Sequence, residues 1–170
     1  ITLQIMNKEV DIVTLHMFDR KVNIEYFKKE PENIKTTENL IDKRIQNARE
    51  MYNIACDYKA KGDFNNAIKI FEESIELNPN YIDALNNLGN TYSSMEEYDT
   101  ALKYFYKAAE LAPDEPIILN NKAICLMELG KLEEAKISFE KAIQIQPDFF
   151  QAYNNLGKLF SLKNDLRINK

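Results

Sequence analysis

Residues 82–115 read IDALNNLGNTYSSMEEYDTALKYFYKAAELAPDE, and residues 116–149 read PIILNNKAICLMELGKLEEAKISFEKAIQIQPDF. The two stretches share their length and their order of small, aromatic and proline positions. The same pattern extends back over residues 48–81 and forward into an incomplete unit at 150–170. A fixed period of this kind is typical of proteins built from stacked, repeated supersecondary units.

Each unit contains two helical patterns. In the first half, apolar residues recur at spacings of three and four, which places them on one helix face. The eighth position of every unit is small: Ala55, Gly89, Ala123 and Gly157. In the second half, an alanine at position 20 is followed one turn later by a phenylalanine: Ala67-Phe71, Ala101-Phe105 and Ala135-Phe139. Gly62 and Gly130 mark turns between the helices. A proline closes each complete unit, because the residue before proline is driven out of helical geometry.

These positions resemble the tetratricopeptide repeat family, over residues 48–170. The small residue at position 8, Ala at 20, the aromatic at 24 and Pro at 32 occur in every complete unit. The resemblance implies an all-α, right-handed superhelical solenoid of antiparallel helix pairs. We therefore expect a repeat domain at residues 36–170, with units 48–81, 82–115 and 116–149 and a partial or capping unit at 150–170. The sequence departs from the family pattern at Lys122 and Ser74.

The N-terminal part of the chain has a different pattern. Residues 1–27 hold three runs rich in β-branched and aromatic residues, which favour a short β-meander. A helix over the same residues stays open, because several of the apolar residues also share a helical face. Residues 28–39, KKEPENIKTTEN, are predicted to be a linker with a helix start at Thr36 or Thr37. We take residues 1–35 as an N-terminal segment, which either packs on the first repeat or belongs to a different domain.

Composition excludes several classes of function. The net charge is −5 and no dense Lys/Arg cluster is present, which disfavours a nucleic-acid or anionic membrane surface. No apolar run reaches the length of a membrane span, so we expect no membrane insertion. Two cysteines are too few for a disulfide framework and indicate a reducing compartment, so we expect a cytoplasmic protein. The chain does not begin with Met, which suggests a fragment or a processed product.

Residues able to perform chemistry are scarce. His16 is the only histidine, and we interpret it as a surface or edge residue because a metal site needs several ligands. Cys56 and Cys125 form no CxxC motif and are interpreted as small buried hydrophobes. The four glycines all have repeat positions, so no phosphate-binding loop remains. We expect no catalytic site, no metal and no cofactor, and hence not an enzyme.

Asparagine is the polar residue that recurs. It occupies position 6 of all four units and position 5 of the last three; the residues are Asn53, Asn87, Asn121 and Asn155, and Asn86, Asn120 and Asn154. Stacked repeats hold equal positions in register, so these side chains are predicted to form a ladder. In the resembled family this helix face lines a concave groove. Similar ladders in the repeats of O-linked N-acetylglucosamine transferase hold the backbone of a bound peptide. An amide can do this because it both donates and accepts hydrogen bonds.

The ladder predicts a protein–protein interaction module that binds an extended peptide segment, with Asn90, Ile124 and Met127 also lining the groove and Ile117 as a further apolar contact. The competing interpretation is that these asparagines are only a solvated surface. For the whole chain, one alternative is a structural subunit that uses its convex face or repeat ends, including self-association through the open C-terminal end. Another is the regulatory repeat region of an enzyme whose catalytic part lies outside this chain.

Some members of the resembled family bind the acidic C-terminal tails of heat-shock chaperones through a dicarboxylate clamp of five lysine, arginine and asparagine positions. The residues at those positions here are Tyr52, Cys56, Asn87, Ile117 and Asn121. Only Asn87 matches, and no cation is available to pair with a carboxylate. We therefore expect a largely neutral ligand rather than an acidic chaperone tail.

Overall fold

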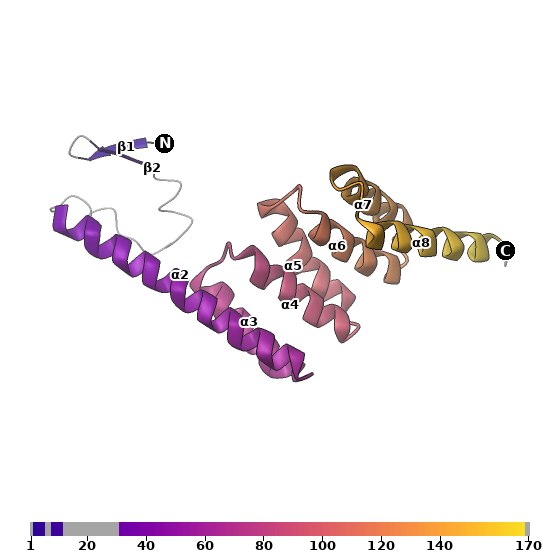
Figure 1. Cartoon of the computed structure of the whole chain (residues 1–170), viewed down its shortest axis with the longest axis horizontal. Helices are drawn as coiled ribbons and strands as arrows, with labels where there is room; N and C mark the ends of the chain where they lie inside the picture. Colours follow the sequence, from indigo (N-terminus) through magenta and orange to yellow (C-terminus); the bar gives the residue numbers. More distant parts are fainter. Residues whose placement is uncertain (1, 6–7, 12–30, 169–170) are drawn as a thin grey trace.

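The computed structural model describes residues 2–5, 8–11 and 31–168, with side chains from residue 38 to residue 165. In this part of the chain, seven helices pack one after another as antiparallel neighbours (Figure 1). The helices are α2 (Pro31–Ala60), α3 (Phe64–Leu77), α4 (Ile82–Ser94), α5 (Tyr98–Leu111), α6 (Pro116–Glu128), α7 (Leu132–Ile145) and α8 (Phe150–Ile168). The predicted all-α architecture of stacked helix pairs is confirmed.

The core lies between the two helices of each unit and between successive units. The alanines of position 20 and the phenylalanines of position 24 are all fully buried. The ring of Phe105 lies directly on Gly89, where an added Cβ would come within 2.8 Å of the ring. The small residue at position 8 therefore lets the two helices of a unit approach closely.

Turns and helix ends follow the predicted signals. Gly62 and Gly130 adopt positive φ angles of 77° and 74° in the turns within their units. Glu96 holds the equivalent place in the middle unit and adopts a φ of 62°, in a region that a residue with a Cβ enters at a cost. The residues just before Pro79 and Pro147 are extended rather than helical, so α3 and α7 stop where the prolines predict.

Both departures from the family pattern have a structural explanation. Ser74 is fully buried, and its hydroxyl donates a hydrogen bond of 2.7 Å to the backbone carbonyl of Ala48. This bond joins α3 to α2 and satisfies the buried hydroxyl. Lys122 is half-buried, and its ammonium lies 5.4 Å from the ring centroid of Tyr106 on α5. The aromatic face compensates in part for the burial of the charge.

The N-terminal segment contains a hairpin of strands β1 (Thr2–Ile5) and β2 (Lys8–Asp11), paired antiparallel with Ile5 opposite Lys8. These eight residues are therefore strand and not helix. The third predicted strand and His16 lie outside the described residues. The predicted linker at residues 28–39 is wrong from residue 31 onward, because α2 already begins at Pro31. Proline is well tolerated in the first turn of a helix, and extending a formed helix costs little.

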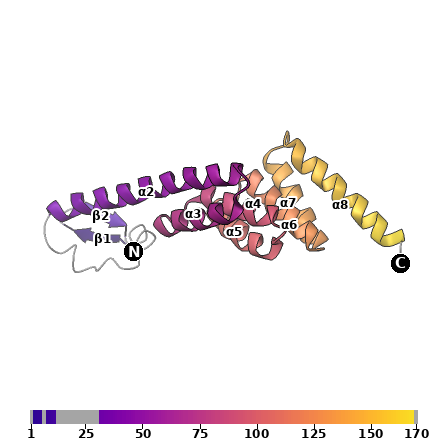
Figure 2. The same ribbon diagram turned by 90° about the horizontal axis from the view of Figure 1, so that it is seen from below.

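The two ends of the solenoid are formed by different elements. The N-terminal half of α2 extends beyond α3 at one end, and α8 is the outermost helix at the other (Figure 2). Helix α8 runs without interruption over 19 residues. No helix in the described part of the chain combines the length and the apolar character needed to span a bilayer.

Candidate peptide-binding face

The asparagines of the first helices form a hydrogen-bonded chain across the repeats. Position 6 of each unit donates its side-chain amide to position 5 of the unit before it. The three bonds run from Asn87 Nδ2 to Tyr52 Oη (3.1 Å), from Asn121 Nδ2 to Asn86 Oδ1 (3.2 Å) and from Asn155 Nδ2 to Asn120 Oδ1 (3.0 Å). We call these three bonds the rungs. Each rung joins neighbouring first helices, in the order α2, α4, α6 and α8, so the amides connect the repeats to one another.

The amide of Asn87 is the most fully used. Its Nδ2 also donates to the backbone carbonyl of Asp83 at 3.1 Å, and its Oδ1 accepts a hydrogen bond from Lys59 Nζ at 3.2 Å. Both of its N–H groups are thus occupied within the protein. Asn121 retains one N–H, since its amide donates only to Asn86 and its Oδ1 accepts from Asn120 at 3.4 Å.

Three asparagines of the predicted binding face carry side-chain amides without a partner in the described part of the chain. Asn53 and Asn154 are exposed and Asn90 is half-buried. None of their side-chain amides makes a hydrogen bond with the side chains and backbone that the structure describes. Each therefore presents a donor and an acceptor that a ligand can use. The predicted asparagine positions thus divide into amides used in rungs and amides without a partner in the described structure.

Two tyrosine rings pack together at the first-repeat end of the face. The ring of Tyr52 packs against Tyr81 with centroids 5.1 Å apart, and against Phe71 at 5.9 Å. Burial raises the pKa of Tyr52, and Cys56 and Asp83 raise it further, so its hydroxyl stays protonated. Burial also lowers the pKa of Lys59, whose ammonium donates a hydrogen bond to the side chain of Asn87.

The three predicted apolar contacts are not equally accessible. Ile117 is 49% exposed, whereas Ile124 is half-buried and packs against the core. Met127 is only 8% exposed and belongs to the core itself. Sequence reasoning missed this difference, because the apolar stripe of α6 is unusually broad and includes Cys125, which is fully buried.

The cysteines behave differently from each other. Both are free thiols. Cys125 is buried as predicted, and burial raises its pKa, while Cys56 is only half-buried on the face of α2 beside Tyr52. Among the described residues, no three side chains of the metal-ligating types come together.

Comparison with known sequences identifies the repeats. The family model described as "Tetratricopeptide repeat" matches residues 82–115 and 116–149, and one described as "TPR repeat" matches residues 55–95. Together the matches span more than half of the chain. No curated protein sequence matches the chain.

Several solved structures share the fold. The first TPR of Spaghetti (RPAP3), bound to the HSP90 peptide SRMEEVD, is 22% identical with a TM-score of 0.68, covering 70% of this chain and 94% of that one. The second TPR domain of human RPAP3, in complex with the HSP70 peptide SGPTIEEVD, is 22% identical with a TM-score of 0.66, covering 68% and 97%. MamA from Desulfovibrio magneticus RS-1 is 20% identical with a TM-score of 0.66, covering 71% and 68%. At these identities the likeness shows the fold.

Proposed function

The chain belongs to the tetratricopeptide repeat family, and we propose that it is a protein-interaction module that holds an extended peptide segment against the face of α2, α4, α6 and α8. The observation that carries this proposal is the set of open amides at Asn53, Asn90 and Asn154, beside rungs that fix the helices bearing them. Open amides on a rigid scaffold pair with peptide groups at a small entropic cost. We also propose that the chain acts by binding a partner and not by catalysis.

The rungs and the open amides have different roles in this proposal. Asn87, Asn121 and Asn155 hold neighbouring repeats together by donating hydrogen bonds to Tyr52, Asn86 and Asn120, respectively. These residues position the face, and the unused N–H of Asn121 adds a donor to it. The open amides supply most contacts to a ligand backbone, while Ile117 and the exposed edge of Ile124 offer apolar contact.

We further propose that the ligand is largely neutral. Two of the solved relatives were determined with acidic peptides of HSP90 and HSP70. In this chain, the five positions of a dicarboxylate clamp hold no cation, and two of them, Asn87 and Asn121, are occupied by rungs. The free thiols of both cysteines support a reducing compartment such as the cytoplasm.

The test begins by selecting ligands for the wild-type chain from a displayed library of random linear peptides. The double variant Asn53→Ala/Asn90→Ala should bind a selected peptide about tenfold more weakly, because it removes two amide contacts. Its urea midpoint should not fall below that of the wild type, since neither amide has a partner in the fold and alanine is the better helix former. The peptide SRMEEVD serves as the acidic probe and should not bind.

The matched control is Asn121→Ala, which removes a rung. It should lower the free energy of unfolding by about 1 kcal/mol, since it removes one inter-repeat hydrogen bond and leaves Asn86 unpaired. Unchanged affinity in the Asn53→Ala/Asn90→Ala variant would refute peptide capture by the open amides. Tight binding of SRMEEVD would refute the exclusion of acidic ligands.

A further inference from the structure

The rungs leave side-chain donors unused on the peptide-binding face. Asn86 accepts its rung through Oδ1, and neither of its own N–H groups has a partner in the described part of the chain. Asn121 and Asn155 each donate one N–H to a rung and keep the other. At the first rung, the Lys59 ammonium donates only to Asn87 Oδ1 and retains further N–H groups. Every rung therefore has an unused donor beside it.

The acceptors of the same face are mostly occupied. Four side-chain oxygens already accept a hydrogen bond within the protein, namely Oδ1 of Asn86, Asn87, Asn120 and Asn121. The row of rungs thus offers a ligand more N–H groups than free acceptors. A ligand that complements this row presents carbonyl oxygens and few N–H groups towards it.

The spacing of the rungs sets the period at which those carbonyls must recur. The rungs join α2 to α4, α4 to α6 and α6 to α8, so successive rungs lie one helix separation apart. Neighbouring packed helices are about 8–10 Å apart. A polyproline II segment turns once every three residues, or about every 9 Å, so the carbonyl of every third residue recurs at this spacing.

A β-strand fits the row of rungs less well. Groups on one side of a strand recur at every second residue, about every 6.5–7 Å, which does not match the helix separation. The edge of a strand also presents as many N–H groups as carbonyls, so donors would face donors. Both the period and the excess of donors therefore favour polyproline II over a strand.

Apolar side chains lie on the same face as the rungs. The hydroxyl of Tyr52 accepts the first rung, and its ring packs against Tyr81 with centroids 5.1 Å apart. Both rings are half-buried, and Ile117 on α6 is 49% exposed. Grooves that bind polyproline II segments are lined by aromatic side chains on which the proline rings pack.

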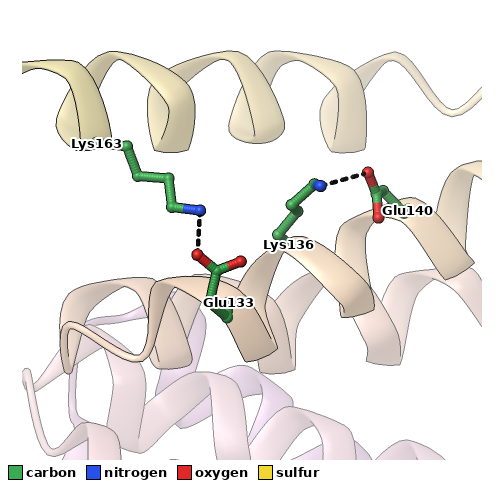
Figure 3. A network of polar contacts seen from close by, with 4 residues as sticks. All are labelled: Glu133, Lys136, Glu140 and Lys163. Carbon is green, nitrogen blue, oxygen red and sulfur yellow. Dashed lines mark hydrogen bonds and ion pairs between the residues drawn. The ribbon is translucent and has the colours of Figure 1, made fainter.

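The last first helix, α8, is fixed against the solenoid. Leu159 of α8 is fully buried. Lys163 on α8 forms an ion pair with Glu133 on α7, which Figure 3 shows beside the Lys136–Glu140 pair within α7. The position of the third rung is thus set by the fold. A preformed row of donors and a preformed polyproline II segment both lower the entropic cost of binding.

On the basis of the proposed function, we propose that the ligand is a proline-rich segment in the polyproline II conformation that crosses α2, α4, α6 and α8 in turn. The carbonyl of every third residue accepts a hydrogen bond from the donor beside one rung, and proline rings lie on Tyr52 and Ile117. Proline suits this row because it has no backbone N–H and its φ is already fixed. Residues 1–170 do not themselves supply such a segment, since no two of the five prolines are adjacent.

The probe is a labelled peptide of four Pro-Pro-Ala repeats, which is neutral and favours polyproline II. The control peptide has the same length and consists of four Ser-Gly-Ala repeats, which are flexible. Fluorescence anisotropy with the full chain should show saturable binding of the proline peptide, about tenfold tighter than that of the control. No binding of the proline peptide, or equal affinity for the two peptides, would overturn the proposal.

The variant Asn86→Asp tests the unused donors without removing a rung. Aspartate keeps the oxygen that accepts from Asn121, and it lacks both N–H groups of the amide. It should bind the proline peptide about tenfold more weakly, with a urea midpoint close to that of the wild type. The matched control Asn65→Asp makes the same change at an exposed position of α3 and should leave binding unchanged. Wild-type affinity in Asn86→Asp would contradict the assignment of the donors.

A second variant keeps the proposal testable if Asn86→Asp fails to fold. Ile117→Gln changes an exposed side chain and should weaken binding of the proline peptide, so unchanged affinity would overturn the proposal. The library-selected peptides separate this inference from the proposed function. If they bind through Asn53 and Asn90 while the proline peptide does not bind, only the polyproline II inference fails. If they bind Asn53→Ala/Asn90→Ala as tightly as the wild type, the proposed function fails.

Discussion

The same substitution at two equivalent glycines should change stability in opposite directions. Gly89→Ala and Gly157→Ala both replace glycine inside a helix at position 8 of a unit, which by itself stabilises a helix by about 0.5–1 kcal/mol. At Gly89 the new methyl would come within 2.8 Å of the Phe105 ring, and at Gly157 it would meet nothing within 4 Å. The helix contribution cancels in the comparison, so the difference between the variants measures overpacking alone.

Overpacking a dense core costs about 1–3 kcal/mol. The lower half of this range is expected, because Ala55 and Ala123 pack at the same position in other units, which shows that a methyl is accommodated once the second helix shifts. Urea denaturation followed by circular dichroism should place the Gly89→Ala midpoint about 0.5–1 M below that of Gly157→Ala, for a slope of about 2 kcal/mol/M. Equal midpoints would refute the claim that ring contact requires glycine at residue 89.

Four further experiments test other parts of the fold. Ser74→Ala should cost about 1–2 kcal/mol in urea denaturation, because it leaves a buried α2 carbonyl without its 2.7 Å hydrogen bond; a neutral result would contradict this account. Glu96→Gly should raise the free energy of unfolding by about 0.5–1 kcal/mol by relieving its φ of 62°, and a loss of stability would show that the turn depends on the glutamate side chain. Burial and the Glu72 carboxylate raise the pKa of Tyr92 to about 12 from 10.0, so the folded state keeps this hydroxyl neutral when the unfolded chain ionises. Stability should therefore be complete below pH 10 and fall as pH rises from 10 towards 12, and Tyr92→Phe should reduce that loss. An aromatic disulfide reagent should label one thiol quickly and Cys125 only after denaturation, because Cys125 is fully buried; rapid labelling of two thiols would argue against its burial.

The repeat could be predicted from the sequence because the residues that determine its packing lie close together in each unit and recur at a fixed spacing. The alanine and phenylalanine of each second helix must be buried together, and proline must end that helix, so their 34-residue spacing is visible in one chain. The start of α2 was not predictable in the same way, because Pro31 is compatible with both a linker and a first helical turn.

The ladder was predicted only in outline. Aligning the repeats in the sequence places equal positions of successive units together. In the structure, each rung instead joins position 6 of one unit to position 5 of the unit before, as Asn121 joins Asn86. That offset depends on how neighbouring helices are staggered, which the sequence does not state. The signal was nevertheless present as the doubled asparagine of the last three units. The burial of Met127 depends likewise on tertiary packing and not on its helical position alone.

The rungs also have a mechanical consequence. Each one connects two first helices along the same side of the solenoid, at 3.0–3.2 Å between the bonded atoms. Any bending or unwinding of the superhelix changes the separation of these helices, and a hydrogen bond weakens steeply when its atoms move apart. Bending that separates the first helices on this side therefore weakens or breaks the rungs, and the amides oppose that deformation.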